Sequence, residues 1–315
     1  MNAEAGANRT RWLRVRHATL YEYEGEVEGA CHLAHLRPRE TDTQQVRGWT
    51  LHVQPRPDAG AGLAGGVRET HDPWGNARQT FAHSQVHDRL EVISTFEAGL
   101  RAPPRAEPGA GLPWREVARA LRYHARVSRA DDEAYEAAEF TLASPLAPVA
   151  PALAEWAAPV AGEHEDVVGL ALGLMHRVHE RFTYRPHATS VATGALEALA
   201  QGQGVCQDYA HVMIGALRSL GLAARYVSGY LRTHPIEGSP GLVGTDASHA
   251  WVAVWCPPLG WLALDPTNDV PAALDHVTLA WGRDYEDVAP LRGVIRGGGN
   301  SPPHVAVAVE PLDVA

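Results

Sequence analysis

The sequence predicts an α+β protein, with an antiparallel β domain at the N-terminus and a domain of helices and strands after it. Three observations support this fold class. Residues 1–100 alternate apolar and polar side chains, residues 166–182 show a helical repeat, and residues 206–265 combine one helix with three short strands. At roughly 100–200 residues per domain, a chain of 315 residues favours two domains.

The first hundred residues predict the β domain. Apolar side chains of one parity recur over residues 13–23, 49–53 and 86–96. Turn signals separate these segments, including a glycine-rich run at 60–66 and the sequence Asp-Pro-Trp-Gly-Asn at 72–76. Short alternating strands at this spacing are typical of an antiparallel sandwich. We therefore expect a sandwich-like N-terminal domain over residues 1–100.

Residues 101–150 predict a linker with helical content. Three prolines and two glycines lie within residues 101–111, whereas apolar side chains at 114, 117, 118 and 121 have helical spacing. The acidic, alanine-rich stretch at 131–139 either extends a helix or stays mobile. Prolines make the stretch at 144–159 ambiguous.

Residues 151–315 form the second predicted domain. Its first clear element is an amphipathic helix over residues 166–182. Strands are expected at 224–231, 249–255 and 261–265, with the sequence Pro-Pro-Leu-Gly at 257–260 turning between the last two. A glycine-rich turn at 296–300 precedes a final strand at 305–309, and we assign these C-terminal strands to the same domain.

Composition narrows the classes of partner. The formal net charge is −10, all 27 basic residues are arginines, and most of the acidity lies in the second half. Such a surface repels phosphate, so we expect neither nucleic-acid binding nor membrane docking. No run of 18 apolar residues occurs, and residues 1–16 lack an apolar signal segment. We expect a cytoplasmic protein whose three cysteines are reduced thiols.

The segment after residue 202 carries the strongest functional signal. Cys206 follows a glycine-bracketed loop and opens an apolar helix that stops at Gly221. The free amides and the positive dipole end of a helix N-terminus stabilise a thiolate, and the same amides can receive a developing oxyanion. Cys206 is therefore a candidate nucleophile.

A histidine and an aspartate follow on the predicted hairpin. His249 and Asp265 are 16 residues apart, and their midpoint is Pro257 in the turn. A loop centred there would place the two side chains directly opposite each other, on one face and within reach of a hydrogen bond. Asp265 would then fix the tautomer of His249 and leave the other ring nitrogen to the thiol. The order Cys, His, Asp suits nucleophilic catalysis.

Four motifs stand out in the second domain: Gly-Val-Cys-Gln-Asp-Tyr-Ala-His at 204–211, Asp-Ala-Ser-His-Ala-Trp at 246–251, Asp-Pro-Thr-Asn at 265–268 and Gly-Arg-Asp-Tyr at 282–285. These motifs resemble those of the bacterial transglutaminase-like superfamily, and the N-terminal region resembles the β domain that precedes the core in this group. The resemblance implies a papain-like core with Cys206 as nucleophile, His249 as base and Asp265 as orienting carboxylate. It also implies that Tyr184, upstream of the cysteine, supports the oxyanion. No calcium loop of the animal cross-linking enzymes is recognisable.

The expected reaction is acyl transfer from an amide through a thioester. We expect hydrolysis of peptide, isopeptide or other amide bonds, as in a cysteine protease, with a peptide or protein as substrate and no cofactor. Two alternatives remain open, namely amine transfer to protein glutamine, as in a cross-linking transglutaminase, and a peptide-binding module without activity. The oligomeric state is not readable, and substrate specificity is expected in the loop at 233–247.

Structural roles compete with each catalytic one. Cys206 could be a small buried side chain, His249 could bond a backbone carbonyl, and Asp265 could cap the turn that follows it. Tyr184 could be a half-buried aromatic residue, and Asp208 and His211 favour structural roles. No metal is expected, because two histidine-containing groups lack zinc-site spacing: Cys31, His32 and His35 in one, His176 and His179 in the other.

Overall fold

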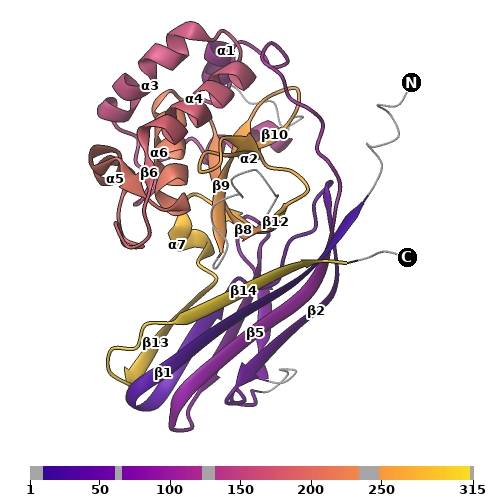
Figure 1. Cartoon of the computed structure of the whole chain (residues 1–315), viewed down its shortest axis with the longest axis vertical. Helices are drawn as coiled ribbons and strands as arrows, with labels where there is room; N and C mark the ends of the chain where they lie inside the picture. Colours follow the sequence, from indigo (N-terminus) through magenta and orange to yellow (C-terminus); the bar gives the residue numbers. More distant parts are fainter. Residues whose placement is uncertain (1–9, 61–65, 123–131, 234–247, 313–315) are drawn as a thin grey trace.

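A computed structural model describes residues 10–60, 66–122, 132–233 and 248–312. It confirms the α+β fold class: a strand-rich N-terminal region is joined to a domain with helices packed on a second sheet (Figure 1). The strands are β1 (Arg11–Ala34), β2 (Gln44–Gln54), β3 (Arg68–His71), β4 (Ala77–His83), β5 (His87–Leu100), β6 (Thr183–Tyr184), β7 (Gln203–Gly204), β8 (Ala224–Leu231), β9 (His249–Trp255), β10 (Trp261–Asp265), β11 (Val270–Pro271), β12 (His276–Gly282), β13 (Leu291–Gly297) and β14 (His304–Pro311). The helices are α1 (Trp114–Ala120), α2 (Asp132–Glu139), α3 (Pro151–Glu163), α4 (Val167–Arg181), α5 (Ala195–Gln201), α6 (Cys206–Ser219) and α7 (Tyr285–Val288).

Strand β1 is the spine of the N-terminal sheet. It is 24 residues long and alternates buried with exposed side chains over its first part. Strands β5 and β4 run antiparallel along one of its edges, β2 extends the sheet beyond β5, and β3 extends it beyond β4. The described strands of this region therefore belong to one hydrogen-bonded network.

The C-terminal strands complete this sheet instead of joining the second domain, to which the sequence analysis assigned them. Strand β13 pairs with β1 as far as Ala34, opposite Leu291, and β14 pairs with β1 as far as Leu13, opposite Pro311. In Figure 1 the yellow β13 and β14 lie alongside the indigo β1. Three glycines with positive φ, at 297–299, carry the chain from one strand to the next. The added strands satisfy backbone groups on the second edge of β1, which local sequence patterns do not reveal.

Residues 11–100 contribute to a single hydrogen-bonded sheet, and not to the two separate sheets of the expected N-terminal sandwich; this sheet packs on the second sheet of the chain. Leu13 and Phe96 on that sheet pack with Tyr230 and Val277 on the second sheet in one buried cluster. The hydroxyl of Tyr230 also lies 3.0 Å from Nδ1 of the buried His17. The apolar cluster and this hydrogen bond together fix the position of the second sheet against the first.

The chain segment that follows the N-terminal strands forms helices, as the sequence predicts. Helices α1 and α2 fall within the predicted linker, and part of that linker, residues 123–131, lies outside the described chain. Helix α4 reproduces the predicted amphipathic helix, and the carboxylate of Asp166 caps it by accepting the amides of Val168 and Gly169, each at 3.1 Å. Helix α3 accommodates Pro159 within its length.

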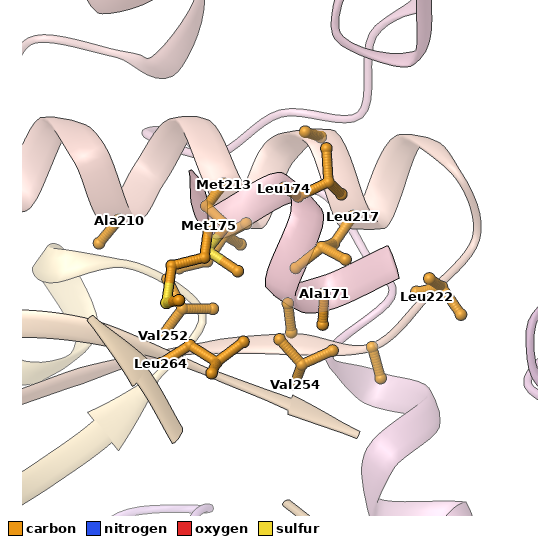
Figure 2. Packing of buried hydrophobic residues seen from close by; sticks show 14 of the residues in the cluster. Ala171, Leu174, Met175, Ala210, Met213, Leu217, Leu222, Val252, Val254 and Leu264 are labelled. Atoms are coloured by element: carbon orange, nitrogen blue, oxygen red, sulfur yellow. The ribbon is translucent and has the colours of Figure 1, made fainter. Parts of the chain in front are cut away.

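The second sheet has the strand order β11-β10-β9-β8-β12. Strands β8, β9 and β10 have the bounds expected from the sequence. Helix α6 covers one face with α4 beside it, and Met213, Leu217, Val252 and Leu264 meet there in a continuous apolar core (Figure 2). Each such fully buried side chain contributes about 1.5–3 kcal/mol, and together these side chains hold α6 against β9 and β10.

Within the described residues, none of the helices combines the length and the apolar character that a membrane span requires.

Candidate active site

Cys206 is the first residue of α6 and is partly exposed. Strand β7 leads directly into it, and the carboxylate of Asp208 holds this junction by accepting the Val205 amide at 2.7 Å and the Thr189 hydroxyl at 2.6 Å. Gly204 is required here because a side chain at that position would collide with the Asp208 carboxylate. The thiol is thus fixed at a helix N-terminus, where the first amides have no partner inside the helix.

His249 begins β9 and Asp265 ends β10, and both side chains are buried. Nε2 of His249 lies 2.8 Å from Oδ2 of Asp265. The expectation that the two residues are directly opposite is wrong, because Leu264 pairs with Val252 and the register is shifted by two residues. A shift of two keeps both side chains on the same face, and a diagonal pair is still within reach of long side chains.

The Asp265 carboxylate accepts a complete set of hydrogen bonds. Oδ1 accepts the amides of Thr267 at 3.0 Å and Asn268 at 3.3 Å, and Oδ2 also accepts the Asn268 side-chain amide at 2.7 Å. Burial alone would raise the pKa of this carboxyl, but His249 and His276 outweigh burial and hold the pKa well below its usual value. Asp265 is therefore an anion at neutral pH.

The charge state of His249 follows from its neighbours. Burial disfavours the imidazolium, but the Asp265 carboxylate and then the Cys206 thiol outweigh burial and raise the pKa of His249 to about 10. Nδ1 of His249 has no hydrogen-bond partner among the described residues. The structure thus holds a cationic ring against Asp265, with Nε2 committed to the carboxylate and Nδ1 not engaged by any described residue.

His276, at the start of β12, is a member of the site that the sequence analysis missed. Its Nε2 lies 3.1 Å from the same Oδ2 of Asp265, and its ring packs edge-on against Trp251 at 5.3 Å. It comes 11 residues after Asp265, beyond a turn of no regular pattern. The only signal in the sequence is its position just before an apolar strand, which is weak.

The imidazoles of His249 and His276 and the Asp265 carboxylate offer atoms within 4.8 Å of one another, a spacing that a cation could use. The protonation of these side chains, however, does not fit the binding of a cation. Nδ1 of His276 lies 3.3 Å from the amide of Ala273, which can only donate, so the ring proton of the neutral histidine is on Nε2 and points at Asp265. A metal ligand needs that nitrogen unprotonated. The cluster is therefore a hydrogen-bonded charge assembly.

Tyr184 lies beside the loop that carries the cysteine. It pairs with Gly204 in the short parallel ladder of β6 and β7, two residues before Cys206. Burial and then the neighbouring thiol raise the pKa of Tyr184, so its hydroxyl keeps its proton. The phenol ring is half-buried and tilts against Tyr209 at 6.5 Å.

The other residues singled out in the sequence either have structural roles or do not join the candidate site. Nε2 of His211 accepts the amide of Tyr285 at 3.2 Å, which ties α6 to α7, and burial lowers the pKa of His211 to about 3. Cys31 is exposed whereas His32, next to it on β1, is buried, as expected for successive residues of a strand. Burial raises the pKa of Cys256 to about 12, which makes it an inert thiol. The predicted specificity loop lies outside the described residues apart from Thr233.

Two family models match this chain. The model of the transglutaminase-like superfamily matches residues 154–266, which contain all four candidate catalytic residues. The model of the bacterial transglutaminase-like N-terminal region matches residues 13–98, which form the N-terminal part of the first sheet.

Individual proteins of other organisms are similar to this chain, some over most of its length and some over a part of it. An uncharacterised protein of Mycobacterium tuberculosis is 35% identical over 313 residues, 96% of this chain and 94% of the relative. A protein-glutamine gamma-glutamyltransferase of Pseudomonas aeruginosa is 37% identical over 138 residues, 41% of this chain but 20% of that protein. The structure of a candidate cysteine protease from Cytophaga hutchinsonii has the same fold, with a TM-score of 0.74, 18% identity and coverage of 98% of this chain and 93% of that one.

The resemblance indicated by the sequence motifs is confirmed over both domains: the chain belongs to the bacterial transglutaminase-like family.

Proposed function

We propose that the protein is a cysteine hydrolase that cleaves amide bonds in peptides or proteins through a thioester, with Cys206, His249 and Asp265 as its catalytic triad. The observation that carries this proposal is the orientation of His249. Its Nε2 is held by Asp265 at 2.8 Å while its Nδ1 is left for the Cys206 thiol, whose interaction helps to raise the pKa of the ring. This is the division of roles that an activated cysteine needs.

The reaction begins with attack of the Cys206 sulfur, as a thiolate, on the amide carbonyl carbon. The new C–S bond displaces the carbonyl π electrons onto oxygen, and the helix N-terminus stabilises that oxyanion. Collapse of the intermediate breaks the C–N bond, and the departing amine takes a proton from Nδ1 of His249. Water, deprotonated by the now neutral His249, then hydrolyses the thioester and releases the carboxylic acid.

In the same mechanism Tyr184 supports the oxyanion as a hydrogen-bond donor. Its place beside Gly204 and the raised pKa of its hydroxyl, caused by burial and then by Cys206, favour this role. A donor that keeps its proton at neutral pH can point it at a developing negative charge.

Amine transfer is the second candidate reaction, because a relative that matches 138 residues is named as a protein-glutamine gamma-glutamyltransferase. The two reactions share the thioester and differ in whether water or an amine resolves it.

We place the enzyme in the cytoplasm, where reduced thiols persist. All three cysteines lie within the described residues, and they are unpaired.

The test combines two assays on three proteins. Wild type, Cys206→Ala and the control Cys31→Ala are incubated with a glutamine-containing peptide library, and new amino termini, ammonia release and incorporation of a fluorescent primary amine are followed. We expect hydrolysis by wild type and Cys31→Ala, with no turnover by Cys206→Ala. Turnover by folded Cys206→Ala would refute the nucleophile, and amine incorporation faster than hydrolysis would favour the transferase. A binding module would bind peptide without turnover in all three proteins.

A further inference from the structure

We infer that His276 is a positioning residue that acts on His249 through Asp265 and limits how strongly the carboxylate stabilises the imidazolium. The inference rests on the proposed catalytic role of Cys206, His249 and Asp265. It extends that role to a second histidine on another strand, β12, which brings its own hydrogen bond to the same carboxylate oxygen.

The tautomer of His276 is fixed by its two partners. The Ala273 amide donates to Nδ1 at 3.3 Å, so the single proton of the neutral ring is on Nε2 and is donated to Oδ2 of Asp265 at 3.1 Å. The ring is held in this orientation by edge contact with Trp251 at 5.3 Å, and the side chain is only 4% exposed. His276 is thus a fixed donor with little freedom to rotate.

The donation has two consequences for Asp265. First, Oδ2 accepts His249 at 2.8 Å, Asn268 at 2.7 Å and His276 at 3.1 Å, so the carboxylate cannot turn away from His249 without losing other bonds. Second, each donor withdraws negative charge from the oxygen that faces the imidazolium. Removing one donor should therefore make Oδ2 a stronger acceptor and stabilise the charged form of His249 further.

The charged and titratable surroundings of His249 among the described residues are few. Asp265 faces it from β10, His276 from β12, at 6.2 Å between ring centroids, and Cys206 from α6. Asp275 precedes His276 in the chain but is bound by Arg11 at 2.7 Å and lies 3.7 Å from Arg232. The proton on His276 Nε2 is therefore the group that can be altered without changing the triad itself.

Two substitutions separate the donor from the bulk of the side chain. In His276→Gln the amide nitrogen can occupy the place of Nε2 and donate to Asp265. In His276→Asn the side chain is too short to reach that place, although it can still accept the Ala273 amide at the place of Nδ1. The matched control is His17→Gln, a buried histidine of the N-terminal sheet that bonds Thr19 and Tyr230.

The readout is the pH dependence of kcat/KM together with that of Cys206 alkylation by iodoacetamide. We expect His276→Asn to shift the basic inflection of both profiles upward by about one pH unit and to lower kcat about tenfold. His276→Gln should restore the wild-type inflection, and His17→Gln should keep it. Thermal unfolding of each variant verifies that it is folded.

The inference is overturned if folded His276→Asn keeps the wild-type basic inflection, or if His276→Gln shifts it equally. If His276→Asn does not fold, His276→Gln decides by itself: a wild-type inflection supports the donor, and an altered one refutes it. Alkylation reads the pKa of His249 without any turnover. A shift in alkylation with no hydrolysis in wild type would therefore support the linkage while refuting the proposed reaction.

Discussion

Nε2 of His249 lies 2.8 Å from Oδ2 of Asp265, although the two residues are offset by two positions on neighbouring strands. Both side chains are withdrawn from solvent. A cation and an anion are costly to bury separately, so each depends on the other and on the surrounding donors for its charged form. The pair is therefore both a structural element of the second sheet and the electrostatic centre of the candidate site.

Replacing Asp265 with asparagine should abolish this coupling with little change in volume. The imidazolium loses its counter-charge, so the pKa of His249 falls and the tautomer is no longer fixed. We expect kcat/KM to fall by about 10²- to 10⁴-fold, the range typical of general acid–base catalysis. Steady-state hydrolysis measures the loss, and circular dichroism verifies the fold. A variant with more than a third of the wild-type activity would contradict the role of the carboxylate.

The raised pKa of His249 also predicts a dependence of stability on pH. The pKa is about 10 in the folded protein, against a reference value near 6.5, so protonation favours the folded state. This contribution is fully present below about pH 6.5 and is lost as the pH rises toward 10. Urea unfolding of wild type at pH 6, 8 and 10 should show decreasing stability. The loss should be smaller in His249→Gln, and equal slopes would refute the linkage.

Arg218 is expected to be the most important buried cation for folding of the second domain. Its guanidinium donates to the carbonyls of Phe140, Ala224 and Arg283 and is almost wholly buried. Arg218→Met removes all of these hydrogen bonds from the buried site and should cost about 3–5 kcal/mol of unfolding free energy, the range for broken buried networks. Denaturant unfolding measures the cost, with the exposed Arg119→Met as control. A cost below about 1 kcal/mol would show that the network adds little.

The contact between the two sheets can be tested at Tyr230. Its hydroxyl is paired with Nδ1 of His17, while burial lowers the pKa of His17 to about 4 and keeps the ring neutral at pH 7. Tyr230→Phe leaves that nitrogen buried without a partner, and we expect a loss of about 1–3 kcal/mol. Tyr135→Phe on the exposed face of α2 should change nothing. Equal stability of the two variants would mean that the hydrogen bond is not needed at the interface.

Local patterns in the sequence predicted much of the second domain. The bounds of β8, β9 and β10 follow from apolar runs between turn residues, and Gly221, with φ of +84°, marks the end of α6 as expected. The centre of the hairpin was predicted at Pro257, one residue too early, and this shifts the pairing across the strands by two residues. The strands pair as if centred on Pro258, since Trp255 faces Trp261 and Gly260 takes the positive φ that closes the turn.

Contacts between segments far apart in the sequence could not be predicted from local patterns. Pairing of β13 and β14 with β1 joins segments more than 250 residues apart, and no local periodicity specifies which edge a strand completes. His276 enters the site for a similar reason, because the turn after β11 and not a repeat brings it to Asp265. The alternation of side chains predicted the main parts of β1, β2, β5 and β14 but not β4, β12 or β13, and the partners of all these strands depend on the packing of the whole molecule.

The most direct test of the account is the rate of alkylation of individual cysteines at pH 6, measured by peptide mass spectrometry after brief exposure to iodoacetamide. An ion pair with His249 predicts that Cys206 reacts at least about tenfold faster than the exposed Cys31, and that His249→Gln removes the difference. Cys256, buried and with a pKa of about 12, should stay unlabelled. Equal rates for Cys206 and Cys31 in the wild-type protein would contradict the central claim that His249 activates this thiol.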